Sequence, residues 1–421
     1  MRVHLDYGVD GLDVDLPDDR VTVIEPQARP AMTDPRAALV AAFRAPLGCP
    51  PLRELVRQGQ TVAISVCDVT RAQPRRETLE AIFDELPQLS PEAVTILIAT
   101  GTHRTNTPAE IESMLGPAIA SRYRVVNHDS RDPSTLVFVG TTTTGVPVYL
   151  NRTFMDADVR ITTGFVEPHF FAGFSGGPKM VAPGLAGLQT VLVLHDATRI
   201  AHPNATWGVT EGNPIHDDVR EIARLVGVHF AVDVTLNREQ RITAVFAGDL
   251  FAEHRAACEA AKANVMQPVA APFDVVLTTN SGFPLDQNLY QAVKGMSAAA
   301  KVVKPGGTIV CAAECSDGLP SHGSYGDVLR SQPSPEKLLA MITAPGYSVP
   351  DQWQVQIQAQ LQIKARVLVK TAGLTPEAVR AAHFEPVDDV AGAVGASLRA
   401  AGPLATLCVL PQGPQTIPYL R

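Results

Sequence analysis

The chain has 421 residues, of which 45% are hydrophobic and 19% charged, and its formal net charge at pH 7 is −8. This length predicts two or three domains, and the apolar content is sufficient for packed cores. The acidic balance argues against sequence-independent binding to nucleic acid, which needs a surface that neutralises phosphates. Six scattered cysteines form neither a zinc motif nor a disulfide framework. Without a membrane-length apolar run or the apolar stretch of a secretory signal, we expect a cytoplasmic protein.

The first elements in chain order are short strands, predicted by the alternation at residues 3–5 and the apolar run at 21–24. Residues 36–58 predict a helix that is interrupted by Cys-Pro-Pro. Two strand–helix units follow, with apolar strands at 61–66 and 94–99 and helices from about Arg76 and over 108–115. Continuous apolar strands that alternate with helices indicate a doubly wound, parallel α/β sheet.

Polar residues follow the two apolar strands directly. Asp68 and Arg71 come after the first, and His103 and Arg104 come after the second. The carboxyl ends of parallel strands are where ligands bind in such sheets. We therefore expect these four side chains at a functional site.

A change in composition at residues 266–272 predicts a domain boundary. We assign 1–268 to an N-terminal α/β domain, completed by about 400–421, and 272–398 to a C-terminal α/β domain. The remaining predicted elements are a strand at 158–163, helices at 215–226 and 249–264, a strand at 273–277, a helix from about Leu289, a strand at 308–311, and a helix that passes into a strand over 353–369. The predicted fold class is two α/β domains with mostly parallel sheets and an active-site cleft between them.

The segment from Gly173 to Lys179 is rich in glycine but is not a phosphate-binding P-loop, because Pro178 precedes the lysine and Met180 follows it. Glycines let the backbone approach a ligand closely. A single lysine fixed after such a turn suits a covalently linked or cofactor-linked amine. The alternative is a tight turn with a solvated lysine.

Four histidines lie at the ends of strands or apolar runs, namely His103, His128, His169 and His195. Any one of them, taken singly, is more often a core histidine with one hydrogen bond. They do not form the HExxH zinc motif. Two histidines beside one ligand would nevertheless supply a general base and a general acid near neutral pH.

Arg71 is the better carboxylate ligand among three neighbouring arginines, because Arg75 and Arg76 fit solvated positions at a helix start. A guanidinium binds a carboxylate through two parallel hydrogen bonds. Further along the chain, Gln291 and Lys294 share one helical face near an N-terminus that Asp286 or Asn288 can cap, and could reach a phosphate. The alternative for that pair is an exposed polar face.

Taken together, these segments resemble the nickel-dependent lactate racemase family of 2-hydroxyacid racemases and epimerases. The matching residues, in chain order and over most of the chain, are Asp68-Val-Thr-Arg71, Ala99-Thr-Gly-Thr-His103-Arg104, Pro168-His169, Gly173-Phe-Ser-Gly-Gly-Pro-Lys179, His195, Pro284-Leu-Asp-Gln-Asn-Leu-Tyr290-Gln291-Ala-Val-Lys294-Gly295 and Trp353.

The resemblance implies a nickel pincer nucleotide, a pyridinium-3,5-bisthiocarboxylic acid mononucleotide with nickel, supplied by separate cofactor-biosynthesis enzymes. It implies covalent attachment of this group to Lys179 and coordination of nickel by His195, and an imidazole with sulfur donors suits Ni(II). The other implied roles are acid–base catalysis by His103 and His169, substrate binding by Arg71, Lys294, Tyr290 and Trp353, and cofactor binding by Asp68, Gln291 and Lys294.

The implied reaction is racemisation by proton-coupled hydride transfer through a bound 2-keto acid, with lactate or malate as the substrate. Malate would need a second cation, for which Arg75, Arg76 and Arg104 are candidates. One alternative is C2 epimerisation of a sugar acid. Another is a non-catalytic binding protein of the same fold, which the presence of Lys179 and His195 disfavours. An NAD-dependent dehydrogenase is disfavoured because no GxGxxG follows a strand.

Overall fold

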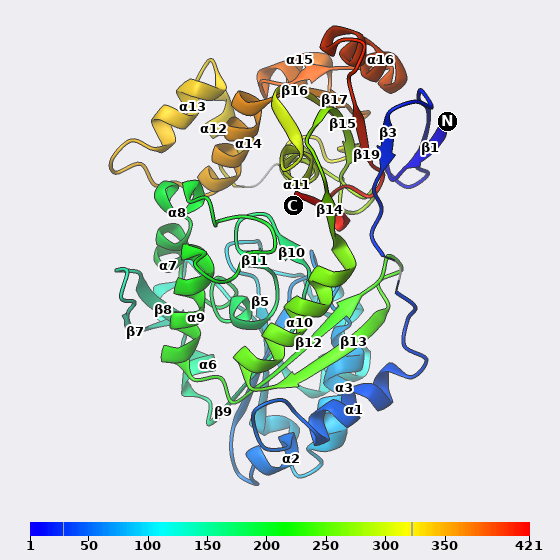
Figure 1. Ribbon diagram of the computed structural model, residues 1–421. Helices are drawn as coiled ribbons and strands as arrows, with labels where there is room; N and C mark the ends of the chain where they lie inside the picture. Colours follow the sequence, from blue (N-terminus) through cyan, green and yellow to red (C-terminus); the bar gives the residue numbers. More distant parts are fainter. Residues whose placement is uncertain (28, 321–322) are drawn as a thin grey trace. The chain divides into compact units, whose positions relative to one another are not determined.

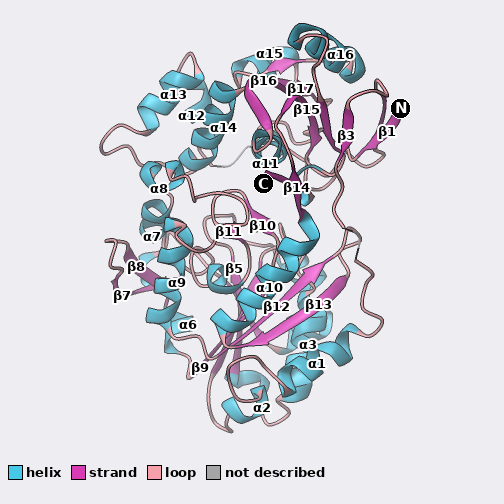
Figure 2. Cartoon of the chain, in the orientation of Figure 1, coloured by secondary structure: helices cyan, strands magenta, loops and turns pink. Residues whose placement is uncertain are grey.

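The computed structural model describes residues 1–27, 29–320 and 323–421, and the chain forms two α/β units (Figures 1 and 2). One, here the central unit, comprises Ala28–His195 and Pro203–Ala263. The other, here the terminal unit, comprises Met1–Gln27, Asp196–His202 and Asn264–Arg421. Each contains a six-stranded sheet in which most neighbours are parallel. The prediction of two α/β domains with mostly parallel sheets is therefore confirmed. No helix in the described ranges is long and apolar enough to cross a membrane.

The central unit has the strand order β13-β12-β9-β4-β5-β6. All neighbours are parallel except β12 and β13. The strands are β4 (Val62–Cys67), β5 (Val94–Ala99), β6 (Arg124–Asn127), β9 (Val159–Phe165), β12 (Phe230–Leu236) and β13 (Ile242–Gly248). Every residue of β4 is buried, which explains its unbroken apolar sequence, because a strand covered on both faces needs apolar side chains on both.

Helices and short hairpins complete the central unit. They are α1 (Pro35–Arg44), α2 (Leu52–Leu55), α3 (Arg75–Glu85), α4 (Pro108–Leu115), α5 (Pro117–Arg122), α6 (Arg152–Asp156), α7 (Leu188–Leu194), α9 (Pro214–Val226), α10 (Leu250–Val265), the hairpins β7 (Leu136–Thr141) with β8 (Pro147–Asn151) and β10 (Pro168–His169) with β11 (Gly173–Phe174), and the 3-10 turns η1 (Pro91–Ala93), η2 (Pro133–Thr135) and η3 (Gly177–Met180). The helix expected over 36–58 is two short helices, because Pro50 and Pro51 cannot donate to a continuous helix.

The terminal unit has the strand order β18-β17-β16-β15-β19-β3, and all of these neighbours are parallel. The strands are β3 (Val21–Val23), β15 (Phe273–Thr279), β16 (Val303–Ala312), β17 (Arg366–Lys370), β18 (Glu385–Pro386) and β19 (Leu407–Leu410). Two further pairs lie in this unit: the antiparallel β1 (Arg2–Leu5) with β2 (Leu12–Asp15), and the parallel β14 (Met266–Val269) with β20 (Ile417–Leu420).

The helices of the terminal unit are α8 (Ala197–Ala201), α11 (Leu289–Ala300), α12 (Tyr325–Arg330), α13 (Pro335–Ile342), α14 (Gln352–Lys364), α15 (Pro376–Ala381) and α16 (Val390–Ala401), with the 3-10 turn η4 (Gly413–Gln415). The predicted passage of a helix into a strand over 353–369 is confirmed, since α14 leads directly into β17. One core includes Val293 and Val355 from α11 and α14, and a second includes Leu5 from β1 and Val394 from α16.

The predicted domain boundaries are wrong at both ends of the chain. Residues 1–27 and 400–421, which we assigned to the N-terminal domain, belong to the terminal unit. The reason is pairing between distant segments: β3 adds to β19 at the sheet edge, and β14 pairs with β20. Residues 196–202 also belong to this unit, where Gln356 Nε2 donates to the carbonyl of Ala197 at 2.8 Å.

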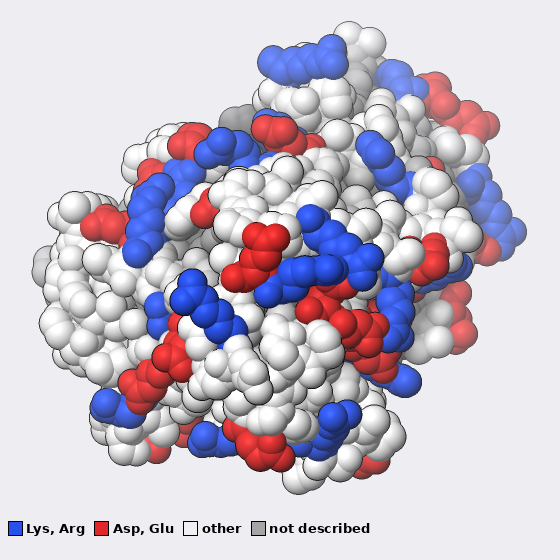
Figure 3. Space-filling view, turned by 90° about the horizontal axis from the view of Figure 1, so that it is seen from below, with Lys and Arg blue, Asp and Glu red and all other residues white. Residues whose placement is uncertain are grey.

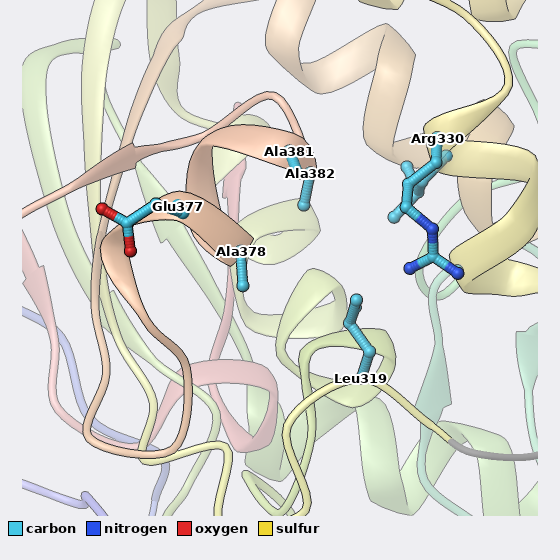
Figure 4. A pocket seen from close by; sticks show the side chains of 8 residues that line it. Leu319, Arg330, Glu377, Ala378, Ala381 and Ala382 are labelled. Atoms are coloured by element: carbon cyan, nitrogen blue, oxygen red, sulfur yellow. The ribbon is translucent and has the colours of Figure 1, made fainter.

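An apolar cavity of about 320 Å³ lies in the terminal unit, where α12 and α15 come together with Leu319 (Figure 4). None of the predicted site residues lines it. Figure 3 shows a different kind of surface, a face on which acidic and basic side chains are interspersed and neither sign predominates.

Candidate active site

Asp68 and His103 lie together at the carboxyl ends of β4 and β5, where the sequence predicts them. The strands end at the paired residues Cys67 and Ala99, so the next residues of each strand emerge side by side. His103 Nδ1 and Asp68 Oδ2 are 2.5 Å apart. Burial opposes the charge of Asp68, but the hydrogen bond and charge of His103, with Arg71 and Thr70, hold the pKa of this carboxyl well below its usual range.

The loop after β4 is fixed by two buried side chains. Gln73 accepts from the amide of Cys67 at 2.7 Å and donates to Thr163 at 2.7 Å. Arg75 donates from Nε to the carbonyl of Cys67 at 2.7 Å and from Nη2 to the carbonyls of Asp68 and Arg71. The expectation that Arg75 is solvated is therefore wrong, because its guanidinium supplies donors that the loop lacks.

Arg71 presents its guanidinium at the end of this loop. Its Nη1 lies within hydrogen-bonding distance of the carbonyl and hydroxyl oxygens of Thr70, at 3.4 and 3.2 Å. Within the described residues, Nε and Nη2 form no hydrogen bond. Two adjacent donors on one planar group are what a carboxylate binds.

His169 lies in the β10–β11 hairpin, where its ring faces the backbone of its own turn. The amide of Ala172 donates to His169 Nδ1 at 3.2 Å. Because Nδ1 accepts, the neutral ring carries its proton on Nε2. In His103 the arrangement is reversed, since ionised Asp68 requires the proton on Nδ1. The two imidazoles therefore hold opposite tautomers.

His195 is buried at the C-terminal end of α7. Its Nδ1 lies 2.8 Å from the carbonyl oxygen of Val191, so the neutral ring donates from Nδ1 and carries its lone pair on Nε2. A backbone carbonyl of this kind often orients a metal-binding histidine. His128, which the sequence left open, is a core residue: its Nε2 contacts the carbonyl of Ala186 at 3.0 Å, and burial lowers its pKa.

Lys179 lies in η3, which contacts β4, β9 and β12. The glycines that precede it pack against other segments of the protein, so our expectation that they face a ligand is wrong. A Cβ at Gly173 would lie 2.1 Å from the carbonyl oxygen of Val209, and a Cβ at Gly177 would lie 2.3 Å from His254. Both glycines also have positive φ angles, of 79° and 49°. These positions accept no side chain, and the turn that presents Lys179 depends on them.

The other four predicted residues lie in the terminal unit. Tyr290, Gln291 and Lys294 are on α11, and Asn288 caps this helix by accepting from the amide of Gln291 at 3.1 Å. Trp353 on α14 donates from Nε1 to the hydroxyl of Tyr290 at 3.2 Å. The structure thus brings Tyr290 and Trp353 together. Asp286 has another role, because it accepts from the amides of Gly8 and Glu314.

Comparison with known proteins identifies the family. The lactate racemase N-terminal domain matches residues 7–208, and the lactate racemase C-terminal domain matches residues 269–417. The lactate racemase of Thermoanaerobacterium thermosaccharolyticum is 34% identical over 422 residues, covering 99% of both chains. The lactate racemase of Lactiplantibacillus plantarum is 35% identical over 370 residues, covering 87% of both. The chain belongs to the lactate racemase family.

Solved structures agree with this family assignment. The lactate racemase apoprotein from T. thermosaccharolyticum matches with a TM-score of 0.93 and 33% identity over 100% of both chains. A Thermotoga maritima protein matches with a TM-score of 0.70 and 18% identity, over 92% of this chain and 98% of that one, and shows the fold alone. The expectation of an isomerase of the racemase type is confirmed at the level of the lactate racemase family.

Sequence reasoning missed Phe171, which contacts three predicted site residues in this member of the lactate racemase family. Its ring centroid lies 4.5 Å from that of His169 and 5.2 Å from that of His195. Lys179 Nζ lies 5.9 Å from the same centroid. The only signal in the sequence was the Phe-Phe pair after His169. Phe171 is the contact that shows these three side chains to be neighbours.

A buried ionisable cluster beneath the Lys179 turn was also missed. Asp233 Oδ2 accepts from the amide of Gly177 at 2.6 Å, and burial raises the pKa of Asp233 to about 7. Burial and the nearby Asp233 hold the pKa of Glu253 well above its usual value. His216 Nδ1 contacts the carbonyl of Ala172 at 3.0 Å, and His254 Nε2 contacts that of Ser175 at 2.9 Å. Burial is the main cause that lowers their pKa values, to about 3 and about 4.

Proposed function

We propose that the chain racemises lactate, with His103 and His169 as the proton-transferring residues. The observation that carries this proposal is the opposite hydrogen bonding of their Nδ1 atoms, which face a carboxylate in His103 and a backbone amide in His169. In the neutral state, His103 offers a lone pair on Nε2 and His169 offers a proton on Nε2. Racemisation needs one group that removes a proton from the substrate and another that returns one.

We further propose that Lys179 and His195 hold the nickel pincer nucleotide. The residues fit this group: His195 is buried with Nδ1 directed to a backbone carbonyl, an arrangement common in histidines that bind a metal through Nε2. Lys179 and His195 also share Phe171 as a neighbour. When bound, the group would supply a hydride acceptor. Asp68, Gln291 and Lys294 are the remaining proposed contacts to it.

We assign substrate binding and proton transfer to different residues according to the chemistry of their side chains. Arg71 binds the substrate carboxylate through its adjacent Nε and Nη2 donors. His103, oriented by Asp68, removes the hydroxyl proton of one enantiomer. His169 returns a proton when the opposite enantiomer forms, and proton exchange with water then restores both rings for the next turnover. Tyr290 and Trp353, already bonded to one another, would contact the substrate together with Lys294.

The charge pattern favours lactate over malate. A dicarboxylate needs a second available cation, and the three candidates are engaged elsewhere. Arg75 is buried in the loop, Arg76 donates to Glu80 at 2.9 Å, and Arg104 binds Glu110 through both Nη atoms, at 2.8 and 2.5 Å. Lys294, the other cation proposed at the substrate, is also assigned to the cofactor, so we propose a monocarboxylate substrate. We also propose a cytoplasmic location.

The test uses chain purified from cells that also express the cofactor-biosynthesis enzymes. Single enantiomers of lactate, malate and a sugar acid are supplied, and products are resolved by chiral chromatography. We expect lactate to racemise, and mass spectrometry to find an adduct of several hundred daltons on the peptide that contains Lys179. Turnover of malate or the sugar acid alone would overturn the substrate proposal. An active protein with an unmodified Lys179 would overturn the attachment.

A second test follows the hydrogen at C2 of deuterated lactate. Hydride transfer predicts that deuterium stays in the product enantiomer, whereas removal of that hydrogen as a proton predicts its loss to water. Loss of deuterium at the rate of racemisation would contradict the proposed function.

A further inference from the structure

The central unit contains a cavity of about 370 Å³ that is separate from the predicted site residues. Helices α9 and α10 form its walls. His216, Arg220 and Arg224 are four residues apart on α9 and so share one face. On α10 the facing residues include Arg255 and Lys262. None of His103, His169, Lys179 and His195 lines this cavity.

The lining of the cavity carries more basic than acidic side chains. Arg220 is engaged, because it forms ion pairs with Glu211 and Asp217. In the part of the chain that the structure describes, Arg224, Arg255 and Lys262 form no hydrogen bond or ion pair, and Arg224 lies 5.0 Å from the ring centroid of Phe251. Glu259 is the one other acid in the lining. With Asp217 included, four basic and three acidic side chains leave an excess of one positive charge.

The floor of the cavity is closed by buried groups. Phe174 and Cys258 supply apolar surface, and His216 and His254 stack with ring centroids 5.5 Å apart. One ring nitrogen of each imidazole lies within hydrogen-bonding distance of a backbone carbonyl in the 172–175 turn. These contacts hold the two rings in place, so a bound group would pack against them. The volume of the cavity is sufficient for a small ligand.

We propose that this cavity binds a small phosphate-bearing anion. Two guanidinium groups and one ammonium group supply charge-assisted donors from both walls, and several donors around one cavity suit the several oxygens of a phosphate. The cavity adjoins the turn that carries Lys179, but none of the predicted site residues lines it.

The test is titration calorimetry of the purified chain with inorganic phosphate at low ionic strength. The variant combines Arg255→Gln with Lys262→Gln, both at exposed positions on α10. The matched control is Arg57→Gln, an exposed arginine of the same unit outside the cavity. We expect saturable binding to one site, at least tenfold weaker in the double variant, which is about 1.4 kcal/mol, and unchanged in the control.

A second measurement, NMR of the histidine rings, tests whether phosphate binds in this cavity. Phosphate should shift the imidazole NMR signals of His216 and His254 in the wild type and leave those of exposed His4 unchanged. Absence of saturable binding would overturn the proposal. Equal affinity in the double variant, equal weakening in the Arg57→Gln control, or binding that leaves the His216 and His254 signals unmoved would overturn it as well.

Discussion

Two histidine–aspartate pairs in this chain show the same contact in different surroundings. His103 Nδ1 lies 2.5 Å from Asp68, and His4 Nδ1 lies 2.8 Å from Asp13. The side chain of Asp68 is 4% exposed, whereas that of Asp13 is 45% exposed. Asp68 also accepts from Thr70 and sits in a loop that Arg75 fixes. An exposed ion pair contributes little free energy and its side chains are mobile. We therefore expect the buried Asp68 carboxylate, but not Asp13, to fix the tautomer of its histidine.

The largest expected effect is the loss of one imidazole at the candidate site. His103→Gln should lower the rate of lactate racemisation at least a hundredfold, because general acid–base catalysis contributes about 10²–10⁴. His4→Gln should leave the rate unchanged. Initial rates of the cofactor-loaded enzyme, in both directions, measure the difference. Full activity of His103→Gln in either direction would remove this residue from the mechanism.

Removal of the carboxylate charge should have the next largest effect. Asp68→Asn keeps the shape of the side chain but no longer requires a proton on Nδ1 of His103, so a fraction of the rings adopts the wrong tautomer. We expect kcat to fall about 10²-fold with a smaller change in KM, and Asp13→Asn to change neither. A fall confined to KM would indicate that Asp68 only binds the substrate or cofactor.

The loop that holds Asp68 can be weakened without touching either member of the pair. Arg75→Lys keeps the charge but loses the planar set of donors that reaches four backbone carbonyls. We expect activity to fall about tenfold and the free energy of unfolding to fall by about 1–3 kcal/mol. The control is Arg76→Lys on the exposed side of α3. Equal behaviour of the two variants in activity and urea unfolding would contradict the supporting role of Arg75.

The smallest expected effect is on the pH dependence of stability. Because the pKa of Asp68 is lowered by folding, its contribution is fully present above the unfolded pKa of about 3.8 and is lost as pH falls through the folded value. The difference in unfolding free energy between wild type and Asp68→Asn should therefore shrink on acidification. The difference for Asp13→Asn should be small at every pH and vanish at about 1 M salt. A constant difference for Asp68→Asn would contradict this account.

Local sequence patterns predicted the parts of the molecule that depend on neighbouring residues. Strand ends placed Asp68 and His103 together because parallel strands expose their carboxyl ends at one edge. The predicted domain boundaries were wrong because β3 pairs with β19, a strand far along the chain that local patterns do not connect to it. The glycines before Lys179 were misinterpreted for the same reason, since the groups that exclude a side chain there, Val209 and His254, come from distant segments.

The most direct test of the opposite tautomers is ¹⁵N NMR of the histidine rings at about pH 8.5, where an ordinary imidazole is neutral. The variants His103→Gln and His169→Gln assign the signals, and no bound cofactor is needed. The structure predicts a proton on Nδ1 of His103 and on Nε2 of His169. Observation of the same tautomer in both rings would contradict the assignment of one as base and the other as acid.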